Sequence, residues 1–440
     1  MRFVPSSDGR LRFAAMISMV HRMKRLIFAL SALAACSPGA SPEQYGFITK
    51  LGNDTIAVER VTRSGNSLTS DEVDRFPRVR QRHTEITVRP DGGIKRIVMD
   101  IHTPSEPEDQ RDRHVVADVT NNTVTVTKTD KSGRVERTFQ TGGSIAMAHV
   151  PQMYSLYDLF FQAGLNRIAA THPAGDTVRF KQFYIDREFD KFSLHGGTIH
   201  KLANGKAEIW HDWLAGNGDA VVDSANRLVK YSGARTTYLV DVERVAQTPD
   251  IQATGTRFAA NETSAGGAKQ LSVRDTTRAT VGKATFIVDY SRPLARGRQI
   301  LGGVVPYNDV WRTGANAATQ FQTSADITIG DLHVPAGKYT LWTKPTEKGV
   351  ELIVNKQTGQ WGTSYDYQQN LGRMSMASET STAATEKFTI SIVPKDDHHG
   401  TLTMEWGTFK WSAPISSTST MNSESSPNSS ATEEASLLKT

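Results

Sequence analysis

The sequence predicts a mainly all-β protein that consists of two β-rich domains. Short runs rich in Val, Ile, Thr and aromatic residues recur between residues 44 and 414, and turn-forming Gly, Asn and Asp residues separate them. Strands do not alternate with helices, which argues against a parallel α/β sheet. Of the 440 residues, about 400 follow the N-terminal leader, which is more than one hydrophobic core usually holds.

We expect residues 44–247 to form an antiparallel meander, similar to half of a barrel, with one helix packed on it. Hairpin-type links join consecutive strands, and Gly52-Asn53-Asp54 and Asn121-Asn122 are clear examples. In residues 123–127 threonine and valine alternate, so this strand has one buried face. Residues 153–167 carry Leu and Phe at helical spacing, which predicts a helix across the sheet.

This first domain faintly resembles the open half-barrels of lipoprotein-carrier-like envelope proteins. The residues that carry the resemblance are Gly46-Phe47-Ile48 and Leu228-Val229-Lys230-Tyr231-Ser232, which are common strand residues. The resemblance implies an apolar concave face that receives a lipid or a segment of a partner. The alternative is a closed sheet whose interior is filled by its own side chains.

Residues 1–36 are expected to be a signal peptide. Met23-Lys24-Arg25 supplies a basic start, ten apolar or small residues follow, and the run ends at Cys36. This pattern resembles a bacterial lipoprotein signal, which implies lipidation of the Cys36 thiol, anchoring in the membrane and, with Ser37 next to it, residence at the outer membrane of the cell envelope. The alternatives are an ordinary signal peptide and a transmembrane helix, although ten residues are too few to span a bilayer, which needs about 20.

Composition excludes several classes of function. The net charge of +5 comes from interleaved acidic and basic residues, and no long Lys/Arg run is present, so we expect no nucleic-acid partner. Cys36 is the single cysteine. The mature chain therefore has no disulfide and no cysteine nucleophile.

Two segments lack the pattern of a folded domain. Residues 248–269 are rich in Thr, Ala, Gly and Asn, and we expect them to be a linker. Residues 415–440 are rich in Ser, Thr, Asn and Glu, and we expect a disordered tail.

Residues 270–414 are expected to form a β-sandwich or jelly-roll-like domain, because several short strands with regular turns follow one another. The distinctive segments are Val305-Pro306-Tyr307, Val310-Trp311-Arg312-Thr313-Gly314-Ala315-Asn316 and Gln360-Trp361-Gly362. In this order they resemble the bacterial family known as domain of unknown function 2911. The resemblance covers about the C-terminal third of the chain and implies an exported, strand-rich domain, without an activity.

The segment from Tyr307 to Asn316 is the candidate ligand-binding site. Tyr307 and Trp311 are able to stack on a sugar or an aromatic ligand, and Arg312 and Asn316 are able to anchor its polar groups. The alternative is structural. Trp311 would then close one end of the sandwich, while Arg312 and Asn316 bond to loop carbonyls.

Signals for catalysis, cofactors or metals are weak. Gly-x-Ser-x-Gly and glycine-rich phosphate motifs are absent, so we assign no catalytic residue and no cofactor. A hairpin could bring His195 and His200 near His211, but a third ligand at a recognised spacing is missing, and we assign no metal; His398-His399 reads as a polar hairpin tip. The sequence thus indicates a cell-envelope lipoprotein that binds a glycan, a lipid or another envelope protein, or acts structurally. The alternative is a hydrolase that uses Arg312, Asn316 and Glu405.

Overall fold

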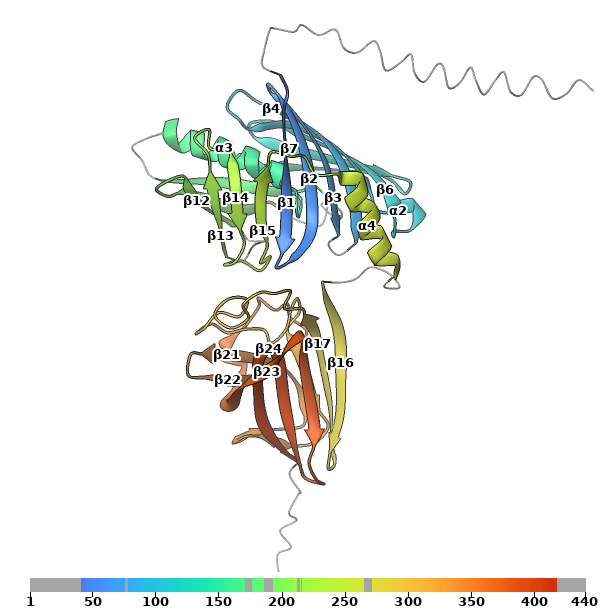
Figure 1. Cartoon of the computed structure of the whole chain (residues 1–440), viewed down its shortest axis with the longest axis vertical. Coiled ribbons are helices and arrows are strands. Elements are labelled where there is room, and N and C mark those ends of the chain that lie inside the picture. Colours follow the sequence, from blue (N-terminus) through green and yellow to red (C-terminus); the bar gives the residue numbers. More distant parts are fainter. Residues whose placement is uncertain are drawn as a thin grey trace, which may run out of the picture. The chain divides into compact units, whose positions relative to one another are not determined.

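The computed structural model describes residues 41–75, 78–170, 176–185, 193–211, 214, 216–264 and 271–417. The leader with Cys36 lies outside the described residues, as does the expected tail from residue 418 onward. The predicted fold class is confirmed, since the chain forms two predominantly antiparallel sheets, one of which carries a long helix (Figure 1). No helix in the described ranges is both long enough and apolar enough to cross a membrane.

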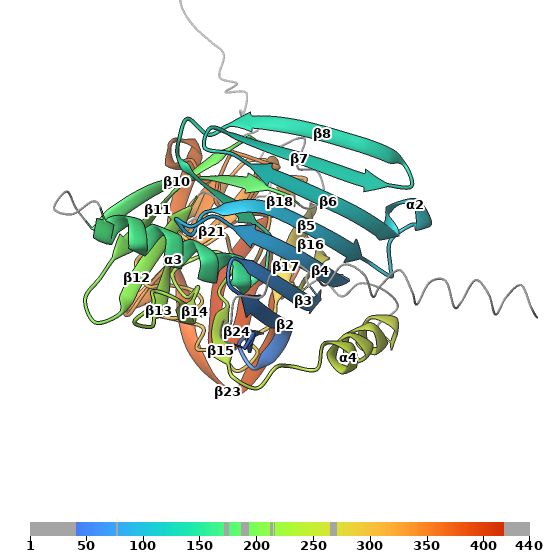
Figure 2. The ribbon, with the colours of Figure 1, turned by 90° about the horizontal axis from the view of Figure 1, so that it is seen from above.

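The N-terminal sheet has 15 strands in the order β8-β7-β6-β5-β4-β3-β2-β1-β15-β14-β13-β12-β11-β10-β9. The predicted meander is therefore present twice, once on each side of the β1–β15 pair (Figure 2). The strands before the long helix are β1 (Glu43–Leu51), β2 (Asp54–Ser64), β3 (Ser67–Arg75), β4 (Val79–Val88), β5 (Ile94–His102), β6 (Asp112–Val119), β7 (Thr123–Asp130), β8 (Gly133–Gln140) and β9 (Ile145–His149), with the short helix α2 (Glu108–Arg111) before β6. The strands after it are β10 (Thr177–Tyr184), β11 (His195–Lys201), β12 (Lys206–His211), β13 (Asn217–Val222), β14 (Leu228–Ser232) and β15 (Asp241–Val245).

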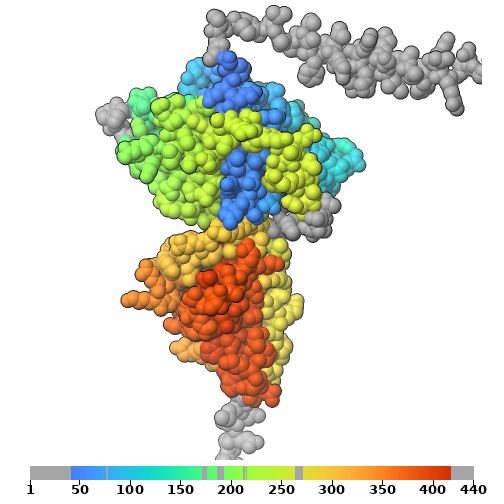
Figure 3. Space-filling view, in the orientation of Figure 1, coloured from blue at the N-terminus to red at the C-terminus, as the bar shows by residue number. Residues whose placement is uncertain are grey.

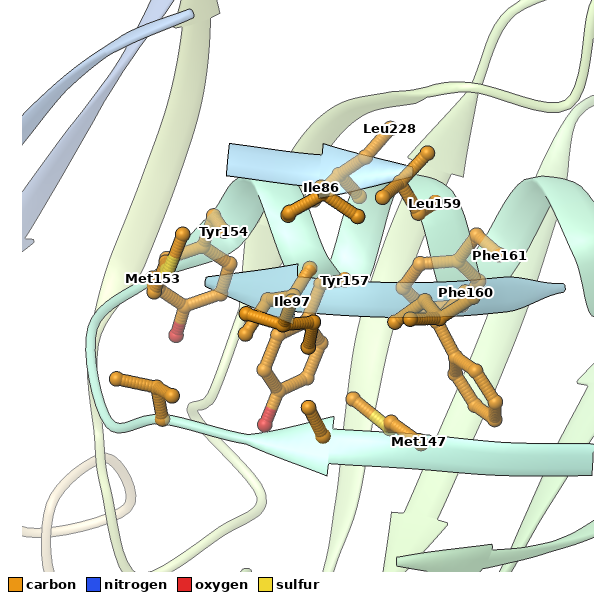
Figure 4. Close-up of a cluster of buried hydrophobic side chains, with 14 of the residues drawn as sticks. Ile86, Ile97, Met147, Met153, Tyr154, Tyr157, Leu159, Phe160, Phe161 and Leu228 are labelled. Atoms are coloured by element: carbon orange, nitrogen blue, oxygen red, sulfur yellow. The ribbon is translucent and has the colours of Figure 1, made fainter. Parts of the chain in front are cut away.

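Helix α3 (Tyr154–Ala170) fills one face of this sheet. Its spacing of Leu, Tyr and Phe residues is the one that predicted a helix at 153–167, and most of its side chains are buried. Figure 4 shows Tyr157 and Phe160 of α3 facing Ile97 of β5 and Met147 of β9. The sheet remains open between β8 and β9, and α3 packs across it as predicted. The apolar concave face that the resemblance implied is filled by side chains of the same chain, although the sheet is not closed.

Helix α4 (Ile251–Ser264) lies in the segment that we expected to be a linker. Phe258 packs against Val58, Val73 and Val79, whose side chains alternate with those that face α3. Figure 3 shows the yellow-green surface of α4 beside the blue surface of the first strands. Thr, Gly and Asn give this segment weak helix propensity, so the sequence did not indicate the helix. Burial of one phenylalanine on the strands supplies the missing stabilisation.

The C-terminal sheet has nine strands in the order β16-β17-β18-β21-β22-β23-β24-β19-β20. The sheet curves so that β17 and β23, which are not neighbours in this order, share one core. The backbone N–H of Ile390 in β23 donates a hydrogen bond to the Tyr290 hydroxyl of β17 (2.8 Å). Strand β24 extends to residue 417, so the sheet continues slightly beyond the expected end of the domain. The strands are β16 (Ser272–Val281), β17 (Ala284–Pro293), β18 (Thr319–Thr323), β19 (Ile327–Ile329), β20 (Leu332–Val334), β21 (Gly337–Thr346), β22 (Gly349–Asn355), β23 (Asn370–Pro394) and β24 (His399–Ser417).

Candidate binding site

Trp311 belongs to the core of the C-terminal domain. It forms an antiparallel bridge with Thr343 of β21, with N···O distances of 2.7 and 3.0 Å between the two backbones. Its indole stacks on that of Trp406, with ring centroids 5.9 Å apart, and only 9% of Trp311 is exposed. Trp311 is therefore removed from the candidate ligand-binding residues, and the alternative, in which it closes the core, describes its position.

The backbone that follows Trp311 is strained and held by hydrogen bonds. Thr313 has φ 51°, a left-handed conformation that is an outlier for a β-branched residue. Its side chain is buried, with Oγ1 3.2 Å from Oγ1 of Thr343, and its carbonyl accepts a hydrogen bond from the Thr319 hydroxyl (2.6 Å). Strained residues of this kind concentrate at functional sites, because the surrounding structure must maintain them. Here the hydrogen bonds of Thr313 hold the backbone next to Arg312 and so fix the direction of the Arg312 side chain.

Arg312 leaves on the side opposite to Trp311 and lies against a second loop, residues 356–369. Gly362 of that loop has no room for a side chain, since a Cβ there would lie 2.2 Å from Cδ of Arg312 and 2.4 Å from the carbonyl oxygen of Asn316. The backbone N–H of Gly362 donates to the same carbonyl (2.9 Å), and Ala317 forms an antiparallel bridge with Trp361. The two loops are thus joined, with the stem of Arg312 between them.

The guanidinium of Arg312 is half-buried and has no acidic partner among the described residues. No ion pair or hydrogen bond from its side chain is present within the described parts of the chain. Burial lowers the pKa of Arg312, and no neighbouring carboxylate opposes this effect. Arginine keeps its charge even so, because its ordinary pKa is above 12. A half-buried, unpaired guanidinium is suited to a planar anion such as a carboxylate or phosphate.

Trp361 supplies an exposed aromatic side chain in the loop against which Arg312 packs. It is 57% exposed, and it neighbours Gly362, against which Arg312 packs. Tyr367, later in the same loop, is 67% exposed. We call Arg312, Asn316 and Trp361 the Arg312 face.

The Arg312 face rests on a small apolar layer. Trp342 of β21 and Ile353 of β22 form a cluster with Ala318, and Tyr365 packs on it with its ring centroid 4.8 Å from that of Trp342. Both loops are therefore supported by the sheet, which gives a surface site a defined geometry.

Two of the four residues predicted from the sequence, Arg312 and Asn316, contribute to this face. Tyr307 is half-buried, and its ring lies against Gly302, where an added Cβ would be 2.9 Å from the ring. Trp361 was part of the distinctive sequence segments but was given no function. The signal available for it was an aromatic residue placed between Gln and Gly in a polar loop.

The alternative catalytic grouping is not assembled at this face. Glu405 lies in β24 opposite Thr389, and no ion pair or hydrogen bond joins it to Arg312 among the described residues. The predicted hairpin tip is confirmed, because His398 lies in the turn between β23 and β24 and His399 begins β24, where its Nδ1 contacts Asp396 at 2.8 Å.

The histidines considered for a metal site divide between different environments. His211 is fully buried, its Nε2 lies 3.0 Å from the Tyr157 hydroxyl, and burial lowers its pKa to about 2. His195 begins β11. A further histidine, His149, was not among those considered from the sequence; its ring lies 5.4 Å from that of His211, and burial lowers its pKa to about 3. His200 instead lies 3.9 Å from Glu208. Within the described ranges, no group of three or more His, Cys, Asp or Glu side chains is placed so that it could hold a metal ion.

Comparison with known families identifies the second domain. Residues 272–415 match the model of the family described as "Protein of unknown function (DUF2911)". This confirms the resemblance stated for the C-terminal third, which contains the whole Arg312 face. The matching family carries no described activity. No curated protein matches the chain.

Two solved structures are similar to parts of the chain. One is a DUF1089 family protein from Pseudomonas aeruginosa, with 11% identity, coverage of 46% of this chain and 95% of that chain, and a TM-score of 0.31. The other is a β-barrel-like protein of domain of unknown function DUF1849 from Brucella abortus, with 11% identity, coverage of 48% and 97%, and a TM-score of 0.30.

Proposed function

We propose that the protein is a lipid-anchored lipoprotein of the bacterial cell envelope, and that its C-terminal domain binds a glycan with acidic groups at the Arg312 face. The observation that carries the proposal is the half-buried guanidinium of Arg312, unpaired among the described residues, which packs against a loop that also carries the exposed indole of Trp361. The indole offers a flat surface on which a sugar ring stacks. The guanidinium offers a bidentate partner for a carboxylate or phosphate of the same ligand.

The polar atoms of this face are free to bind a ligand. In the described structure the side chains of Arg312, Asn316 and Trp361 make no hydrogen bond to other protein groups. Loops 307–318 and 356–369 are already joined by backbone hydrogen bonds, so binding does not require them to fold. A preformed face loses less entropy on binding.

The anchor is supported by the sequence of the leader. Cys36 directly follows Leu33-Ala34-Ala35, and the basic start and apolar run precede it. Two or three acyl chains hold a protein stably at a membrane, because each buried methylene contributes about 0.8 kcal/mol. Replacement of Cys36 with Ala is expected to abolish labelling by an alkyne-tagged fatty acid and to release the protein from the membrane fraction. Retained labelling would contradict the anchor.

Binding is tested with two oligosaccharides of equal length, one of glucuronic acid and one of glucose. The full chain in detergent micelles is titrated with each by calorimetry. Arg312→Gln is expected to weaken binding of the acidic oligosaccharide at least tenfold, because hydrogen bonds to charged groups contribute about 1.5–3 kcal/mol. Trp361→Ala is expected to weaken binding of both oligosaccharides.

The matched control is Trp210→Ala, which removes an indole of β12 that is 39% exposed in the N-terminal domain. This variant is expected to bind as the unmodified chain does. Absence of binding to the acidic oligosaccharide, or binding that is unchanged by both Arg312→Gln and Trp361→Ala, would contradict the proposed site. Shortening of either oligosaccharide during incubation would favour the hydrolase instead.

A further inference from the structure

Strand β8 (Gly133–Gln140) is an open edge of the N-terminal sheet. It is the last strand on one side of the sheet, and Figure 2 shows it as the outermost strand there. Its pairing with β7 is regular along the whole strand, without a bulge. Most of its residues are exposed, and among the described residues no backbone hydrogen bond joins it to any element other than β7. One side of its backbone therefore faces solvent.

The other three edges of the two sheets are short or covered. β9 is a short strand that is mostly buried, and β20 spans only Leu332–Val334. β16 is approached by β23, since the Thr277 hydroxyl donates a hydrogen bond to the carbonyl of Ile390 (2.7 Å). Proteins usually protect an edge strand by shortening or covering it, or with proline, lysine or a bulge. β8 contains neither proline nor lysine, so its edge stays open to a further strand.

The backbone groups on this open edge belong to alternate residues. The register pairs Asp130 with Gly133, and two turn residues lie between them. The first and last residues of such a turn hydrogen-bond each other, and bonded and non-bonded pairs then alternate along an antiparallel ladder. Arg134, Glu136 and Thr138 therefore point their N–H and C=O groups away from β7. A strand that pairs with β8 must bond to these three residues.

The side chains of β8 divide between the two faces of the sheet. On the outer face, the Glu136 carboxylate lies 2.6 Å from the Arg134 guanidinium and 3.0 Å from the Thr127 hydroxyl. These partners lower the pKa of Glu136, so it stays ionised at neutral pH. Val135 points to the opposite face, together with Phe139, which belongs to the core around α3. Unlike Phe139, Val135 is 37% exposed.

We propose that two copies of this chain associate through β8, edge to edge and antiparallel, about a two-fold axis at Val135. This register places Arg134 of each copy opposite Glu136 of the other. The backbone groups of both residues face the edge, so hydrogen bonds form on both sides of the axis. The two Val135 side chains meet as a non-hydrogen-bonded pair, the kind in which side chains lie closest.

The charges of β8 favour this register over its neighbours. Because Arg134, Glu136 and Thr138 must face each other, the axis has to pass through a residue. An axis at Arg134, Glu136 or Arg137 would place that charged side chain directly opposite its own copy. Like charges in such positions destabilise a sheet, whereas opposite charges stabilise it. Among these four centres, Val135 alone pairs opposite charges.

The same symmetry limits the assembly to two copies. A two-fold interface uses the same edge in both copies, so no β8 edge remains for a third. An interface made by one strand pair is small, and we therefore expect a Kd in the micromolar range. Association through β8 does not require the Arg312 face.

Cross-linking of the full chain in detergent micelles tests the axis. Val135→Cys puts two thiols opposite each other, where the Cα atoms of a non-hydrogen-bonded pair lie about 4.5 Å apart, a distance that a disulfide bridges. The matched control is Val273→Cys, which alters another exposed valine on an edge strand, β16. After mild oxidation we expect about tenfold more covalent dimer from Val135→Cys, because paired thiols have a higher effective concentration. The unmodified chain measures any contribution of Cys36.

Charge reversal tests the register. Sedimentation equilibrium gives the dimer Kd of each variant, and circular dichroism verifies that it is folded. Glu136→Arg and Arg134→Glu each turn both opposite-charge pairs into like-charge pairs, so each is expected to weaken association by about tenfold or more. The double variant that combines Arg134→Glu with Glu136→Arg restores opposite charges, and it is expected to regain most of the lost affinity.

Three outcomes would overturn the proposal. The first is an unmodified chain that stays monomeric well above micromolar concentration. The second is equal cross-linking of Val135→Cys and Val273→Cys. The third is a double variant that associates no better than Glu136→Arg alone, since the charges would then not set the register.

Discussion

The Arg312 face and the Asp–His pairs of the N-terminal sheet present polar side chains in opposite ways. At the Arg312 face, strained loop backbone holds polar groups that have no protein partner among the described residues. On the N-terminal sheet, strands β4, β5 and β6 carry three exposed histidines that each have a carboxylate partner on a neighbouring strand. The pairs are His83 with Asp71, His102 with Asp112, and His114 with Asp100. The comparison teaches that a charged side chain without a protein partner indicates a binding site when it is half-buried, whereas exposed histidines that already have carboxylate partners do not indicate one by themselves. The physical difference is desolvation, which penalises only the buried charge.

The largest expected effect separates the two indoles near Arg312. Trp311→Ala removes a buried indole that packs on Trp406, and it is expected to lower the free energy of unfolding of the C-terminal domain by about 3–5 kcal/mol. Trp361→Ala is expected to change it by less than about 0.5 kcal/mol, because this side chain is exposed. Scanning calorimetry measures both. Equal destabilisation by the two variants would remove the distinction between core and face.

The next effect concerns the joint between the two loops of the Arg312 face. Gly362→Ala places a Cβ 2.2 Å from Cδ of Arg312, so the side chain or the loop must shift. We expect a loss of about 1–3 kcal/mol in stability, as for other overpacked positions, together with weaker binding of the acidic oligosaccharide. Gly349→Ala is the control, since no atom lies within 4 Å of its Cβ position. If both variants behave alike, Arg312 is not held by this contact.

A smaller effect distinguishes the two faces of the N-terminal sheet through pH. Burial lowers the pKa of His211 to about 2, whereas an unfolded histidine titrates near 6.5. Above pH 6.5 neither state is protonated at this residue. Below it the unfolded state takes up the proton first, so stability falls by up to about 1.4 kcal/mol per pH unit as pH decreases toward 2.

Melting temperatures between pH 7 and pH 4.5 measure this dependence. His211→Gln retains a polar group near the Tyr157 hydroxyl and is expected to flatten the curve. His102→Gln changes an exposed histidine and is expected to leave the slope close to that of the unmodified chain. Identical slopes in His211→Gln and the unmodified chain would show that His211 does not control the acid response.

The smallest expected effect is the contribution of an Asp–His pair to stability. Asp112→Asn weakens one exposed cross-strand pair, which contributes only about 0.2–1 kcal/mol. Denaturant titration gives the stability change. If Asp112→Asn lowers the free energy of unfolding by well above about 1 kcal/mol, the Asp–His pairs stabilise the sheet more than exposed pairs usually do. The contrast with the unpaired Arg312 would then be smaller.

Much of the fold was predictable because its signals are local. Hairpin residues such as Asn121-Asn122 and the alternation that follows them identify strands without knowledge of their partners. The helix expected at 153–167 appears as α3 for the same reason. Helix α4 was not predictable, because its own propensity is weak and its stability depends on Phe258 packing on strands that are distant in sequence.

The candidate site was predictable in part. The segment around Arg312 stood out because its unusual residues are neighbours in the chain. Alternation along an extended segment separates Trp311 from Arg312, but it does not say which of them faces the core. The bridge between Ala317 and Trp361 joins the loop of Trp361 to the loop of Arg312, and no local sequence pattern predicts this bridge.

The sequence by itself determined the strand-rich class, the hairpins, the helix α3 and the resemblance of the second domain, because each depends on residues that are close along the chain. Tertiary structure alone decided that Trp311 is buried and that Arg312 lies between two loops. It also decided that Asp100 pairs with His114 and that Asp112 pairs with His102. Strand register decides these pairings, and a shift of one residue would turn every side chain to the opposite face.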